Sequence, residues 1–137
     1  MNDKFKEVEL VIPMLPEMEL TATQTAEAVG TFMKLDSEKI DEVKLALIEA
    51  CINAFEHSNS PDGRISVNFE IGDDELIVYM RDQGQGFDLE AVRQELNKRR
   101  AQGDLRGWGL KIMEELMDEV EVMSNEAGTT IKMVKRR

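Results

Sequence analysis

The sequence predicts an α+β fold, a two-layer α/β sandwich in which helices cover one face of a mostly antiparallel sheet. The chain has 137 residues, the size of one compact domain, so we expect a single domain over residues 1–137. Its apolar residues recur in blocks, some at helical spacing and some alternating as in strands. The expected order is strand, helix, helix, strand, strand, lid, helix, strand, strand, which favours this sandwich.

The first half of the chain contains one predicted strand and two predicted helices. Residues 6–12 alternate polar and apolar side chains before two prolines, which predicts a first or edge strand. Residues 17–35 have apolar side chains at helical spacing, although four threonines and Gly30 weaken this helix. Residues 37–55 form the strongest predicted helix, because capping residues precede it and acidic residues occupy its first turn.

The second half contains two pairs of strands around a further helix. Residues 65–71 and 76–80 alternate on either side of a Gly-Asp-Asp turn, which predicts a hairpin. Residues 89–100 are charged and amphipathic and lie between two glycine-rich turns, so they suggest a lid. Residues 110–117 are helical by their spacing, and two closing strands are expected within residues 120–134.

Composition excludes several classes of function. The net charge of −11 disfavours direct binding to DNA or RNA, because it repels a phosphate backbone. The single cysteine, Cys51, forms neither an internal disulfide nor a cysteine-based metal site. No apolar run reaches the roughly 20 residues that cross a bilayer, and the start lacks a signal-peptide pattern, so we expect no membrane contact and a cytoplasmic protein.

One polar row on the strongest helix has the chemistry of phosphoryl transfer. Glu49, Asn53 and His57 stand four positions apart and therefore share one helix face, beside the small Ala46 and Ala50 that leave room for a ligand. A carboxylate can accept a proton, an amide oxygen can ligate Mg²⁺, and an imidazole can donate to phosphate. The spacing alone leaves an ordinary solvated helix face as the alternative.

Two glycine-rich turns could complete a ligand site. The first, residues 82–86, follows a strand; Asp82 can accept a hydrogen bond from a base amino group, and the glycines let the backbone approach a ligand. The second, residues 106–109, precedes a helix whose first N–H groups favour an anion such as phosphate. Taken singly, an ordinary loop and a flexible turn remain the alternatives.

Together, the three segments resemble the ATPase superfamily shared by DNA gyrase, histidine kinases and mismatch-repair ATPases, which has the Bergerat ATP-binding fold. Residues 48–57 resemble its N box, residues 82–87 its first glycine box and residues 106–110 its second. Residues 111–120 look like the bacterial anti-sigma serine kinase branch, and residues 128–130 resemble the closing strand, where a threonine assists adenine binding.

The resemblance implies a role for each motif residue. It implies Glu49 as the general base, Asn53 as the Mg²⁺ ligand and Asp82 as the adenine reader. Arg106 is expected near a terminal phosphate, with His57 supporting the same region. The remaining implied nucleotide contacts are Gly84, Gly86, Gly107, Trp108, Gly109, Leu110 and Thr129.

The resemblance also implies a function. Members of this branch use Mg²⁺ and ATP to phosphorylate a serine on an anti-anti-sigma protein of the STAS type, and as homodimers they sequester a sigma factor. This chain departs from the family on its first helix, where the usual basic residue is absent and its place falls near Thr23. One alternative is a nucleotide-gated binding module that sequesters a regulator without phosphoryl transfer. Another is a structural domain in which the motifs are incidental.

Overall fold

The computed structural model describes residues 6–57, 63–82, 109–125 and 128–137. Within these ranges the elements follow the predicted order, and the predicted lid at residues 89–100 lies outside them. The elements are β1 (Lys6–Pro13), α1 (Glu19–Phe32), α2 (Ser37–His57), β2 (Arg64–Ile71), β3 (Glu75–Asp82), α4 (Gly109–Leu116), β4 (Glu119–Asn125) and β5 (Gly128–Arg136).

The strands form one sheet in the order β1-β2-β3-β5-β4, and every neighbouring pair is antiparallel. The predicted hairpin is confirmed as β2 and β3, in which Val67 lies opposite Met80. The first strand is an edge strand, as predicted, and β4 forms the other edge. The strand β5 lies between β3 and β4, and its register places Thr130 opposite Arg81, near the end of β3.

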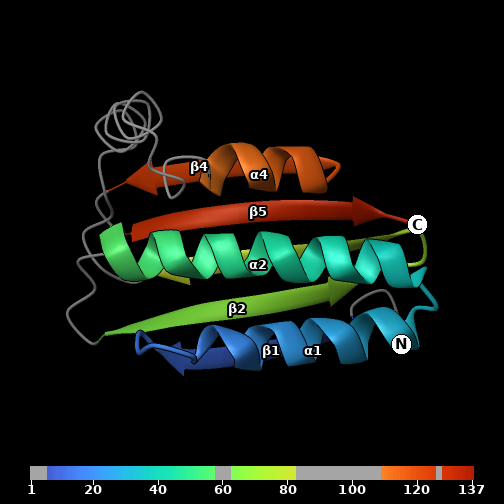
Figure 1. Ribbon diagram of the computed structural model, residues 1–137, viewed down its shortest axis with the longest axis horizontal. Coiled ribbons are helices and arrows are strands. Elements are labelled where there is room, and N and C mark those ends of the chain that lie inside the picture. The colour runs from blue at the N-terminus through green and yellow to red at the C-terminus, as the bar shows by residue number, and fades with distance from the viewer. Residues whose placement is uncertain (1–5, 58–62, 83–108, 126–127) are drawn as a thin grey trace.

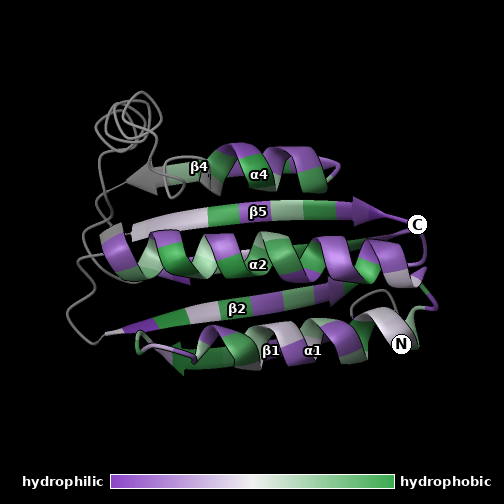
Figure 2. Ribbon diagram, viewed as in Figure 1, coloured by the Kyte–Doolittle hydropathy of each residue, from purple (hydrophilic) through white to green (hydrophobic). Residues whose placement is uncertain are grey.

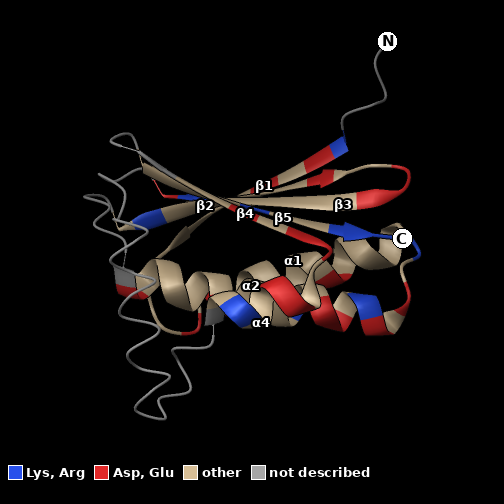
Figure 3. Cartoon of the chain, turned by 90° about the horizontal axis from the view of Figure 1, so that it is seen from above, with Lys and Arg blue, Asp and Glu red and all other residues tan. Residues whose placement is uncertain are grey.

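The described helices cover one face of this sheet, so the molecule has two layers (Figure 3). In the helical layer α2 lies in the middle, packed against α1 on one side and α4 on the other (Figure 1). The predicted α+β sandwich with helices on one face is confirmed. Among the described residues, no helix combines the length and apolar character needed to cross a membrane.

Strand alternation explains why the core lies between the layers. On β3, Leu76, Val78 and Met80 are buried on the helical side, and the residues between them point to the open face of the sheet. Hydrophobic and hydrophilic residues alternate in bands along α2 and α4, as expected for helices with one buried face (Figure 2). Among the described residues, the largest fully buried side chain is Phe69 of β2, and burial of such a side chain contributes about 1.5–3 kcal/mol.

Helices α1 and α2 approach each other closely at Gly30. A Cβ atom at this position would lie 2.6 Å from Cγ1 of Ile40, so a larger residue would push the two helices apart. An ion pair between Glu27 and Lys44, 2.5 Å from oxygen to nitrogen, joins the same two helices. Gly30, which weakens the helix locally, is therefore required by the packing between helices.

Candidate functional site

The polar row of α2 begins with a buried carboxamide. Asn53 is only 6% exposed, and its Nδ2 atom has no hydrogen-bond partner among the described residues. A buried polar atom without a partner costs roughly 1–3 kcal/mol, so a ligand that supplies one explains its place. Asn53 lies one turn before the end of α2, where His57 is the last helical residue; the side chain of His57 is outside the described part.

Glu49, one turn earlier, is half-buried. Burial raises the pKa of its carboxyl above the ordinary value of 4.5, and the nearby Glu56 carboxylate raises the pKa further. A carboxylate with a raised pKa holds a proton more readily, which suits a group that accepts one from a hydroxyl. The small Ala46 and Ala50, predicted to leave room for a ligand, are instead fully buried in the core.

Asp82 ends β3 and continues its buried row beyond Met80. It is only 3% exposed, lies opposite Ile65 of β2 and directly follows Arg81, which lies opposite Thr130 of β5. Gly128 at the start of β5 has a φ of +138°, and a Cβ there would lie 2.2 Å from the main-chain oxygen of Asp82 and 3.4 Å from its Oδ1. Only glycine fits this close approach, so Gly128 fixes where the Asp82 carboxyl lies.

Thr129 follows Gly128 and adds a second buried polar side chain at the same point. It is 3% exposed. Because Arg81 lies opposite Thr130 in the β3–β5 pair, Thr129 lies one position further, beside Asp82. A carboxylate and a hydroxyl thus lie together at one end of an otherwise apolar row, an arrangement that suits recognition of a polar heterocycle.

Four elements bring these groups to one end of the molecule. The end of α2, the end of β3 and the starts of β5 and α4 all lie at the left of Figure 1. Asn53, Asp82 and Thr129 come from three of them, and Gly109 begins the fourth, where Leu110 is buried. The motifs, which are far apart in the sequence, therefore lie at the same end of the molecule as far as their residues are described.

Part of the predicted site cannot be placed. The two glycine boxes fall largely outside the described residues, so their predicted contacts stay predictions. The residues concerned are Gly84, Gly86, Arg106, Gly107 and Trp108.

The first helix departs further from the expected pattern. Thr23 is buried, and its hydroxyl donates a hydrogen bond of 3.0 Å to the main-chain oxygen of Leu20, so its side chain does not reach a partner. No lysine or arginine occurs in α1, and its exposed residues include Gln24 and Phe32. A partner that docks on α1 meets a neutral to acidic surface.

Sequence reasoning missed one contact beside the polar row. Neither Glu42 of α2 nor Lys135 of β5 belongs to a predicted motif. In the structure Lys135 is 6% exposed, and its Nζ lies 3.1 Å from Oε1 of Glu42. The strand alternation of Thr129, Ile131 and Met133 already places Lys135 on the helical side of β5 and could have indicated its burial.

Comparison with known proteins identifies the class. The family described as Histidine kinase-like ATPase domain matches residues 12–135. The serine-protein kinase RsbW of Bacillus velezensis is 36% identical over an alignment of 135 positions, which covers 93% of this chain and 84% of that protein. RsbW of Bacillus subtilis is 33% identical, with the same coverage of both chains.

Solved structures share the fold. The RsbU and RsbW domains of Rv1364c from Mycobacterium tuberculosis superpose with a TM-score of 0.71 at 21% identity, covering 96% of this chain and 32% of that one. The histidine kinase domain of Erythrobacter litoralis EL346 gives a TM-score of 0.53 at 17% identity, covering 98% and 69%.

The fold and the buried polar site thus define an ATPase-type nucleotide-binding domain. The chain belongs to the histidine kinase-like ATPase family and, within it, to the group of the serine-protein kinase RsbW. The resemblance drawn from the motifs, and the class of enzyme that it implies, are confirmed at the level of the family.

Proposed function

We propose that this protein is a Mg²⁺- and ATP-dependent protein-serine kinase that also acts as an anti-sigma factor. The observation that carries the proposal is the buried carboxamide of Asn53, with an unsatisfied nitrogen, on the helix face that also presents the half-buried Glu49. Relatives named serine-protein kinase RsbW across most of the chain support the same activity.

Adenine is proposed to bind where β3 meets β5. The Asp82 carboxylate accepts a hydrogen bond from the adenine amino group, and the Thr129 hydroxyl lies beside it. Gly128 holds this corner in place through its contact with the Asp82 main chain. The phosphates then extend toward α2 and the first turn of α4. There the proposed contacts are His57, Gly84, Gly86, Arg106, Gly107, Trp108, Gly109 and Leu110.

Asn53 is the proposed protein ligand of Mg²⁺. A neutral amide oxygen suits this ion, which usually keeps several waters and takes phosphate oxygens as its other ligands. The described residues contain no group of three His, Cys, Asp or Glu side chains that could hold a metal without such help. When bound, the ion neutralises charge on the phosphates.

The proposed transfer needs one proton acceptor and good alignment. Glu49 takes the proton from the serine hydroxyl of the acceptor protein as the serine oxygen bonds to the γ-phosphorus. The bond from that phosphorus to the β,γ-bridging oxygen breaks, and ADP leaves with the electron pair. The products are phosphoserine, ADP and a protonated Glu49, which later releases its proton to water.

The proposed partners are a sigma factor and an anti-anti-sigma protein of the STAS type that carries the acceptor serine. We place the protein in the cytoplasm as a homodimer. The names of the RsbW relatives support the partner classes, and the neutral to acidic α1 surface suggests that partner contacts differ from those of the family.

Nucleotide binding can be tested with a fluorescent ATP analogue and Mg²⁺. We expect saturable binding by the wild-type protein and its loss in Asp82→Asn, because a neutral amide oxygen accepts a weaker hydrogen bond than a carboxylate and the amide NH₂ group cannot accept one from the adenine amino group. Asp74→Asn, an exposed residue in the β2–β3 turn, is the matched control and should bind normally. Absence of binding by the wild-type protein contradicts the proposal.

Phosphoryl transfer can be tested with radiolabelled ATP and candidate acceptor proteins. Glu49→Gln should lower transfer about 10²–10⁴-fold, the range for removal of a general base. Glu38→Gln, exposed on the first turn of the same helix, should leave transfer unchanged. Transfer at the wild-type rate by Glu49→Gln refutes the assigned base.

A second candidate function is a nucleotide-gated binding module without phosphoryl transfer. The observation that favours it is α1, which lacks a basic residue and buries Thr23. Nucleotide-dependent capture of a sigma factor, together with no transfer to any serine of the copurified acceptor, selects this alternative.

A further inference from the structure

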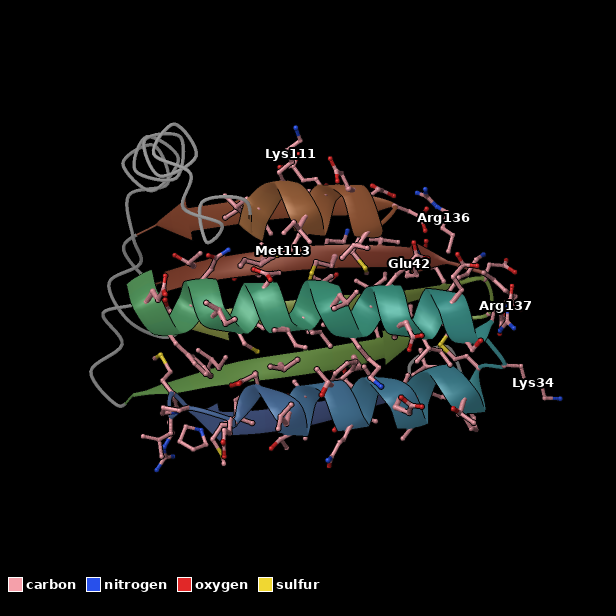
Figure 4. All side chains as sticks on the ribbon, viewed as in Figure 1. Lys34, Glu42, Lys111, Met113, Arg136 and Arg137 are labelled. Carbon is pink, nitrogen blue, oxygen red and sulfur yellow. The ribbon has the colours of Figure 1, made fainter. Side chains whose placement is uncertain are left out.

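A buried lysine joins three elements at the end of the molecule opposite the candidate site. Lys135 lies near the end of β5, on the helical face of the sheet. Its ammonium group lies 3.1 Å from Oε1 of Glu42 on α2 and donates a hydrogen bond of 2.6 Å to the main-chain oxygen of Leu116 on α4. Figure 4 shows Glu42 on the side of α2 that faces β5 and α4.

The hydrogen bond to Leu116 caps α4. Leu116 is the last residue of this helix, and the last carbonyls of a helix lack partners within the helix. A cation at this position also interacts favourably with the helix dipole. The turn that follows is tied to the same strand, because the Asp118 carboxylate accepts a hydrogen bond from the Arg136 main chain. The position of α4 along β5 is therefore fixed at its C-terminal end.

The same lysine sets the position of α2 relative to α4. Glu42 lies two helical turns before Glu49 and shares its face, so the ion pair and the proposed active-site groups lie along one side of α2. Between them, Met113 of α4 is fully buried and points toward α2 (Figure 4). A short helix moves as a rigid rod, so a shift at Leu116 is transmitted about 11 Å to Gly109.

We propose that Lys135 is a positioning residue for the phosphate end of the nucleotide site and acts through α4. By holding Glu42 and Leu116 together, it sets the distance between Asn53 on α2 and the first turn of α4. This inference rests on the proposed function, because it assumes that phosphates bind between those two elements. Adenine binding at Asp82 and Thr129 lies on β3 and β5 and does not depend on the position of α4.

The test compares two nucleotides that differ in the terminal phosphate. Affinities for a non-hydrolysable ATP analogue and for ADP, each with Mg²⁺, are measured for wild type, Lys135→Met and Lys135→Arg. In Lys135→Met we expect affinity for the ATP analogue to fall about tenfold and affinity for ADP to fall less, so that the preference for ATP is lost. Lys135→Arg retains a charged donor and should restore most of the preference.

The matched control is Lys132→Met, which removes the same charge from the open face of the same strand. It should keep the wild-type preference. Circular dichroism and melting curves establish that each variant is folded, because a merely structural role lowers the folded fraction and weakens both nucleotides equally. A folded Lys135→Met with an unchanged preference overturns the proposal.

A second variant covers the case in which Lys135→Met does not fold. Glu42→Gln keeps the shape of the side chain and removes the ion pair, and Glu42 is partly exposed, so this protein should fold. It should reduce the preference for the ATP analogue in the same direction, and an unchanged preference overturns the inference. If the wild-type protein binds neither nucleotide, the proposed function fails with it; if wild type binds both, only the role of Lys135 is in question.

Discussion

The contact between Gly128 and Asp82 is the tightest constraint at the level of single residues. A Cβ at Gly128 would overlap the main-chain oxygen of Asp82, and the φ of +138° is one that side chains with a Cβ rarely adopt. Backbone atoms cannot move aside as a flexible side chain can. The position of the Asp82 carboxyl is therefore determined by a residue that is 46 positions away in the sequence.

We expect Gly128→Ala to weaken ATP binding more than it weakens the fold. Displacement of Asp82 should lower affinity for an ATP analogue at least about tenfold, and backbone strain should cost about 1–3 kcal/mol of stability. Calorimetric titration and urea unfolding measure the two effects. Gly63→Ala is the matched control, because Gly63 also has a positive φ (+64°) but has open space around it. Its ATP affinity should match that of wild type; wild-type affinity in Gly128→Ala would show that this contact does not position Asp82.

Glu49 combines partial burial with a neighbouring negative charge. Both raise the pKa of its carboxyl, so the folded protein binds this proton more tightly than the unfolded chain does. The charged carboxylate therefore destabilises the fold as the pH rises from 4.5 through the pKa in the folded state. The charge on Glu49, the proposed proton acceptor, thus has a cost in stability.

Replacement of Glu49 should reveal that cost as a dependence on pH. Glu49→Gln should melt at a higher temperature than wild type at about pH 7, and the difference should shrink as the pH approaches about 4. Melting curves across this range measure it. Glu38→Gln is again the control. If Glu49→Gln instead melts below wild type at about pH 7 and approaches it toward about pH 4, the pKa of Glu49 is lowered in the folded state.

At the scale of elements, sequence periodicity predicted the helices and strands well. The strongest predicted helix, residues 37–55, is α2 (Ser37–His57), and the predicted hairpin is β2 and β3. These predictions succeed because the pattern of each element depends on which of its own faces is buried. The predicted lid stays a prediction.

Contacts between distant elements could not be predicted in the same way. Gly30 weakens a helix when considered locally, and its value appears only where α1 meets Ile40 of α2. Lys135 looks like part of a basic chain end until β5 is placed between β3 and β4, beneath the helices. Among the site residues, the sequence places Asn53 near the end of α2 and Asp82 at the end of β3, whereas their individual roles remain proposals.

Gly30→Ala should destabilise the protein although alanine is the better helix former. Alanine favours a helix by about 1 kcal/mol, and overpacking against Ile40 costs about 1–3 kcal/mol. We expect a net loss of about 1 kcal/mol in the free energy of unfolding, measured with urea. Thr31→Ala, exposed on the same helix, should be neutral or stabilising. An equal gain in both variants would show that the helices move apart without cost.

At the scale of the whole molecule, the core between the layers encloses Cys51 completely. Its side chain is fully buried, and burial raises the pKa of the thiol to about 12. Because the thiolate is the reactive form, the folded protein should be inert to thiol reagents. Cys51 therefore reports the opening of the whole core.

Labelling of Cys51 should follow global unfolding and slow down when nucleotide binds. When the unfolded protein refolds faster than the thiol reagent reacts, the labelling rate of Cys51 follows the fraction of unfolded protein. Mg-ATP at about 100 times its dissociation constant should stabilise the fold by about 2.7 kcal/mol and therefore slow labelling of Cys51 about 100-fold. Mass spectrometry of the alkylated protein over time measures the rate. Cys51→Ala controls for alkylation at other residues. In Asp82→Asn, Mg-ATP should no longer slow the labelling of Cys51. Rapid labelling in the absence of denaturant contradicts a closed core.

The contrast in burial among Asn53, Asp82 and Glu49 has a consequence for how the site can change by mutation. Asn53 and Asp82 are embedded in the protein, whereas Glu49 is half-exposed and makes the fold less stable when charged. Under the proposed assignment of Glu49 as the proton acceptor, a neutral residue at this position should raise stability and leave nucleotide binding intact. A single substitution would then separate the two proposed functions, giving a protein that binds ATP without transferring its phosphate.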